Sequence, residues 1–251
     1  MSSQVTLAIT IGISILIYIL ACHGAVYYRL HPQTAFVVWL ARTICRPHPG
    51  NWLYQVARFA YYVGIPYVAL RQGIASAQMM GLGEWNGKFE DVLISIGLSG
   101  TAVVLFALAW SARVHSLALP EMPISSRKRH WLMATLDILY LEVHWAFYRS
   151  GPILWLGGDY YAGSILGLAL IWTEGLFDPA LRAGLRRPET SLRIAISWGT
   201  SLCMTMVFFF SRSLWIVIPA HWLVAACSGE IRRMIDSKRA SDINDHFHDG
   251  S

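Results

Sequence analysis

Ionisable side chains inside one long apolar segment constrain this chain more than any other feature of its sequence. The segment around residues 131–152 is apolar, yet Asp137, Glu142, His144 and Arg149 lie within thirteen positions of it. Ionisable groups at membrane depth are costly, so each needs a partner or a function. At 100° per residue, Glu142 and His144 lie about 200° apart around a helix. The helix therefore has two polar faces, and protein must pack on both.

The composition is that of a membrane protein that crosses the bilayer several times. Of 251 residues, 55% are hydrophobic and only 14% are charged, whereas soluble domains carry about 25% charged residues. The 11 Trp and 11 Tyr suit the membrane–water interface. The 4 cysteines show neither CxxC nor Cys/His metal spacing. We therefore interpret them as small apolar residues and not as a disulfide framework.

Apolar runs predict an all-α bundle of about seven transmembrane helices in a single domain, residues 1–229, followed by a polar tail, residues 230–251. The short apolar run 35–41 is too short to span and is expected along the membrane surface. Pro66 predicts a kink, Asp178-Pro179 predicts a helix end or kink, and Ser211-Arg212-Ser213 predicts a tight turn. The predicted spans are roughly 5–28, 54–69, 92–110, 131–149, 161–176, 192–210 and 214–227.

The distribution of basic residues predicts the orientation. The loops after the first, third and fifth spans, together with the tail, hold 15 of the 20 Lys and Arg residues, and the alternate loops hold 4. By the positive-inside rule, the N-terminus is outside and the C-terminus is cytoplasmic, as in a plasma or bacterial inner membrane protein. The net charge of +5 therefore reflects topology, and no nucleic-acid partner is expected.

Three ionisable side chains on different spans form a candidate metal site. His144, Glu174 and His221 supply two imidazoles and a carboxylate, a set that suits Zn²⁺ with one position open for water. Glu142 is then the candidate general base, and Arg149 holds an anion or the Glu142 carboxylate.

Each of these residues also has a structural interpretation. Glu142 can pair with Arg149 two turns away, and His221 can simply bridge two helices. His144 can be held by Asp137 or Tyr148 on its own face, and Glu174 can lie solvated at its helix end.

Three stretches in the right order, covering roughly residues 57–229, resemble the CPBP family of CAAX-protease and bacteriocin-processing membrane proteins. An early Pro-containing helix and loop, an EExxxR-like motif, and a final helix-borne His after a short turn carry the resemblance. These are the runs ARFAYYVGIP through MGLG (57–83), HWAFYRSG (144–151) and SRSLWIVIPAH (211–221).

The resemblance implies a glutamate-type intramembrane protease core, but only Arg149 and His221 match the motifs by identity. His144 and Trp145 stand where the family has its two glutamates, with Glu142 upstream. Glu174 stands where the family's FxxxH motif has its His.

Three functional hypotheses follow. The first is a metal-dependent intramembrane endopeptidase with His144, Glu174 and His221 as zinc ligands and Glu142 and Arg149 as catalytic residues. It would act on a membrane protein or a lipidated peptide, in contact with membrane lipid. The second is an inactive relative that uses the same cavity for binding or assembly. The third is a small proton-coupled transporter, although the sequence shows no inverted repeat of the kind common in that class.

Overall fold

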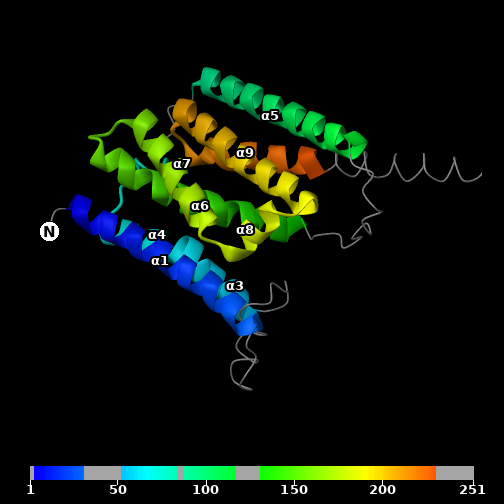
Figure 1. Ribbon diagram of the computed structural model, residues 1–251. Helices are drawn as coiled ribbons and strands as arrows, with labels where there is room; N and C mark the ends of the chain where they lie inside the picture. The colour runs from blue at the N-terminus through cyan, green and yellow to red at the C-terminus, as the bar shows by residue number, and fades with distance from the viewer. Residues whose placement is uncertain (1–2, 31–51, 84–87, 117–130, 230–251) are drawn as a thin grey trace, which may run out of the picture.

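The computed structural model describes residues 3–30, 52–83, 88–116 and 131–229 (Figure 1). Within these ranges the chain forms helices and turns without any strand, which confirms the all-α prediction. The helices are α1 (Ser3–Leu30), α3 (Trp52–Phe59), the π-helix η1 (Ala60–Gly64), α4 (Ile65–Arg71), α5 (Phe89–Ser116), α6 (Trp131–Trp155), α7 (Tyr160–Leu176), α8 (Pro179–Leu185), α9 (Pro188–Ser211) and a last helix, Leu214–Gly229.

Three of the described helices are long and apolar enough to cross a membrane: α1, α5 and α9. A fourth crossing follows if α7 and α8, which meet at 87°, form one bent span. The chain is therefore a membrane protein, although these helices are fewer than the seven predicted spans. Helix α6 does not join them because its polar side chains lower its hydropathy, and the last helix is shorter than 18 residues.

Helix α6 is the centre of the bundle. It packs against α7, α1, η1 and α4, and its residues from His144 to Ile153 are all buried. Figure 1 shows α6 and α7 between α1 on one side and α9 with α5 on the other. One apolar cluster joins Phe147 of α6 to Leu7 and Ile11 of α1. A second joins Trp145 of α6 to Phe208 of α9 and to the last helix.

The predicted breaks occur where the sequence places them. Asp178 accepts a hydrogen bond from the backbone N of Ala180 and begins α8, so α7 ends before Pro179 as predicted. Arg212 ends α9 with a left-handed backbone, φ 47°, and the chain turns into the last helix. Pro66, where a kink was predicted, lies in the first turn of α4, directly after the π-helical turn η1.

Some sequence predictions fall outside the described residues. These are the surface segment at 35–41, residues 117–130 of the basic loop after the third predicted span, and the polar tail at 230–251.

Candidate functional site: two histidine–carboxylate pairs on α6

Both polar faces of α6 are enclosed by protein. Glu142 is 0% exposed and His144 is 1% exposed, although they point in nearly opposite directions around the helix. Each has a partner on another helix, as described below. The prediction that α6 is packed on both faces is therefore confirmed.

The first pair joins Glu142 to His221 of the last helix. The two carboxylate oxygens of Glu142 are used separately. Oε1 lies 2.7 Å from Nδ1 of His221, and Oε2 accepts a hydrogen bond from Nη2 of Arg149 at 3.3 Å. Trp145, one turn along α6, stacks on the His221 ring with centroids 5.7 Å apart and 13° between the planes. The imidazole is thus fixed by a carboxylate at its edge and an indole on its face.

Arg149 is fully buried in a space shaped by its neighbours. Its guanidinium lies over the Phe208 ring of α9, 4.4 Å from the ring centroid. On the α7 side, a Cβ added at Gly167 would lie 2.7 Å from Cα of Arg149, so only glycine allows α6 and α7 to approach this closely. The Nε and Nη1 atoms of Arg149 have no hydrogen-bond partner among the described residues. Glu142 therefore supplies the carboxylate that compensates this buried charge.

The second pair joins His144 to Glu174 of α7. Nε2 of His144 lies 3.4 Å from Oε2 of Glu174, and the hydroxyl of Tyr61 donates to Oε1 of Glu174 at 2.9 Å. The Tyr61 and Tyr148 hydroxyls lie 3.3 Å apart, and Tyr148 donates to the Ser14 hydroxyl of α1 at 3.3 Å. This hydrogen-bonded chain connects α1, η1, α6 and α7 through the interior of the bundle.

The π-helical turn η1 brings two tyrosines onto the His144 ring. The ring centroids of Tyr61 and Tyr62 lie 4.9 and 5.1 Å from that of His144. The Tyr148 ring lies at 4.3 Å. Short π-helical turns are frequent at functional sites because the wider turn displaces side chains from the usual helical positions. Here it places both tyrosines against one buried imidazole, whose Nδ1 has no partner within the described part of the chain.

A third ion pair lies nearer the helix end. Arg58 of α3 contacts Asp137 of α6 at 2.7 Å, and both side chains are about one-fifth exposed. The Arg58 guanidinium also lies 5.5–5.9 Å from the ring centroids of three tyrosines, Tyr54, Tyr62 and Tyr140. Of the two partners expected for His144, Tyr148 lies against the ring, whereas Asp137 pairs with Arg58.

The predicted site residues are brought together in a different combination. The pairing of Glu142 with Arg149 is confirmed. The sequence grouped Glu174 with His221, but the structure pairs His221 with Glu142, and Glu174 with His144. Glu174 is 6% exposed, so the alternative that its carboxylate is solvated is wrong, although it lies near the end of α7. Its depth follows from its contacts with η1 and α6.

The three-ligand zinc site stays a prediction. Zinc sites in proteins use three or four ligands around one point, and each pair described here supplies two. No group of three or more His, Cys, Asp or Glu side chains is placed to hold a metal ion within the residues that the structure describes. In the structure these donors form two separate pairs, His144 with Glu174 and His221 with Glu142.

Sequence reasoning missed Tyr61 and Ser14 as members of these clusters. Helical periodicity does place Trp145 with Glu142, because a residue three positions after Glu142 shares its helix face. No sequence pattern indicates the roles of Ser14 and Tyr61, since these roles depend on the relative depth of separate helices.

Comparison of the chain with protein-family models, curated proteins and solved structures finds no match.

Proposed function

We propose that this protein is a CPBP-like intramembrane hydrolase that cleaves peptide bonds within the bilayer. The observation that carries the proposal is the fully buried Glu142 carboxylate shared between His221 and Arg149. Such an arrangement is costly in a membrane protein and resembles the oriented histidine of hydrolytic enzymes.

The chemistry assigns separate roles to the two residues. When Nδ1–H of His221 donates to Glu142, Nε2 is the basic nitrogen of the ring. In the proposed reaction Nε2 accepts a proton from the water molecule that attacks the peptide carbonyl, and it then returns this proton to the leaving amine as the C–N bond breaks. Glu142 orients the imidazole and stabilises the imidazolium, and Arg149 donates a hydrogen bond to the same carboxylate. General-base catalysis of this kind contributes about 10²–10⁴-fold.

The resemblance to the CPBP motifs also supports this proposal. Glu142 and Trp145 share a helix face, so Glu142 offers a carboxylate one turn from the position of the second motif glutamate. His144 and Glu174 occupy the motif's Glu and His positions in exchanged order, and they remain 3.4 Å apart. A carboxylate and an imidazole are thus adjacent on each face of α6.

Cleavage inside membranes tests the proposal. Membranes from cells that express the wild type, Glu142→Gln or His221→Gln are compared by mass spectrometry of protein N-termini. We expect new termini within membrane segments that appear with the wild type and fall at least about 100-fold in His221→Gln, the lower limit for loss of a general base. They should also fall in Glu142→Gln, because that variant loses the carboxylate that orients the base. His23→Gln is the matched control, because this exposed histidine of α1 bonds only within its own helix.

The alternative is a non-catalytic membrane protein that uses the same bundle for binding or assembly. It is favoured by the complete burial of Glu142 and Arg149, which already satisfy each other's charge. The same experiment decides between the two proposals. Identical sets of termini from the wild type and both variants would exclude the hydrolase and support the non-catalytic membrane protein.

We further propose seven crossings, with the N-terminus outside and the C-terminus in the cytoplasm of a plasma or inner membrane. The segment α3–η1–α4, helix α6 and the last helix would cross in addition to α1, α5, α7–α8 and α9. The asymmetry of basic loop residues supports this orientation. Reporter fusions after Arg187 and after Arg239 should both report a cytoplasmic location. An external signal at either position would contradict the proposed orientation and number of crossings.

A further inference from the structure

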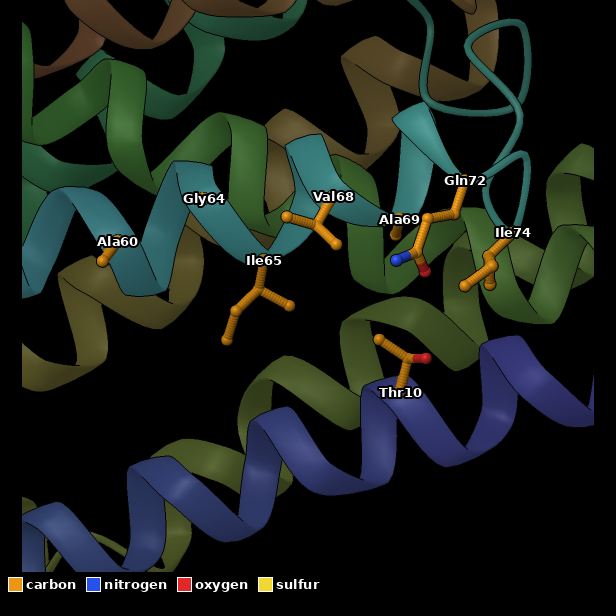
Figure 2. Close-up of a pocket in the computed structure, with 8 residues that line it drawn as sticks. All are labelled: Thr10, Ala60, Gly64, Ile65, Val68, Ala69, Gln72 and Ile74. Carbon is orange, nitrogen blue, oxygen red and sulfur yellow. The ribbon is translucent and has the colours of Figure 1, made fainter.

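A groove of about 410 Å³ lies between α1 and the η1–α4 segment. Figure 2 shows Thr10 of α1 facing Ile65 and Val68 across the gap, with the Gln72 side chain at the end of α4. Small residues on the η1–α4 wall, including Ala60, Gly64 and Ala69, leave this space open. A cavity of this size is in the range of about 300–1,000 Å³ that is typical of small-molecule sites.

The chemistry of the walls limits what the groove can hold. No charged side chain lines it, and its two polar residues, Thr10 and Gln72, are neutral. The Thr10 hydroxyl already donates to the carbonyl of Thr6 at 2.8 Å. An ion, a nucleotide or a free phosphate would lose its hydration there without a compensating charge. An apolar ligand would not lose hydration in this way, so the walls suit an apolar ligand.

The position of the groove identifies the source of such a ligand. Helix α1 is long and apolar enough to cross the membrane, and neighbours of Thr10 such as Ile9 and Ile13 are about half exposed. On α4, Tyr67 and Val68 are also exposed, at 62% and 49%. With α3–η1–α4 crossing the membrane beside α1, as proposed above, the groove opens toward the hydrocarbon of the bilayer. Gln72, at the end of α4, is placed where the apolar wall gives way to polar residues.

We propose that this groove is a binding site for one acyl chain of a membrane phospholipid, with the Gln72 amide donating to the ester carbonyl at the head of that chain. Burial from water does not distinguish this chain from bulk lipid, so retention depends on close packing against the groove walls and on the Gln72 hydrogen bond. The site is independent of the Glu142–His221 pair, and the proposal does not depend on the proposed hydrolase.

A substitution at Gly64 tests the groove without disturbing the packing. A Cβ at Gly64 would meet no atom closer than 3.8 Å, so the backbone accepts a side chain at this lining position, and Gly64→Leu is chosen to fill the groove. Gly100→Leu is the matched control, because glycine 100 lies on the exposed surface of α5 with nothing within 4 Å of an added Cβ. The full chain is placed in nanodiscs that contain phosphatidylcholine with a photoreactive group on the acyl chain, and the labelled peptides are quantified.

We expect labelling of α1 and α4 at the groove to fall about tenfold in Gly64→Leu, equivalent to 1.4 kcal/mol, and to stay unchanged in Gly100→Leu. Gln72→Leu should lower it as well, because the hydrogen bond to the ester is lost. Thermal unfolding checks the fold, and Thr10→Leu fills the groove from the α1 side if Gly64→Leu proves unstable. Equal labelling in the wild type and the filled variants, or labelling of the groove no denser than that of the outer face of α5, would overturn the proposal.

Discussion

Arg149 carries a permanent charge, yet its side chain has no exposed surface. Only one of its three guanidinium nitrogens donates to Glu142, and its flat face lies on Phe208. The stability of the pair therefore depends on both partners being present. Removing one partner of a buried pair usually costs more than the pair contributes, because the other charge remains buried without compensation.

This predicts an asymmetry between single and double substitutions. Arg149→Leu should lower the free energy of unfolding by about 3–5 kcal/mol, and Glu142→Leu combined with Arg149→Leu should recover most of that loss. Unfolding in detergent measures both variants, with Arg71→Leu as the control because Arg71 is an exposed residue at the end of α4. A loss below about 1 kcal/mol for Arg149→Leu would show that the charge is not enclosed as described.

At the scale of elements, the periodicity of α6 predicted its two opposed polar faces, and local chemistry predicted the break at Asp178. The partners on other helices could not be predicted, because they depend on how deep each helix lies relative to its neighbours. The π-helical turn η1 left no sequence signal beyond Pro66, yet it positions Tyr61 on Glu174.

At the scale of the whole molecule, composition identified the class, an all-helical membrane protein, but it could not fix the number of crossings. Polar side chains lower the hydropathy of α6, the helix that the rest of the bundle surrounds. The α3–η1–α4 segment is divided by its π turn, and α7–α8 by a sharp bend. The polar clusters lie on these irregular segments or next to them. Lipid cannot form hydrogen bonds with their backbone and side-chain groups, so polar partners within the protein must do so.

The central claim is that α6 separates two histidine–carboxylate pairs, and double-mutant cycles test it most directly. Unfolding free energies are measured for cycles on Glu142 with His221, His144 with Glu174, and His221 with Glu174, using Gln at each position. The account predicts coupling of about 1–3 kcal/mol in the first two cycles and less than about 0.5 kcal/mol in the third. Strong coupling between His221 and Glu174, with additive effects for Glu142 and His221, would contradict it and indicate a single shared centre.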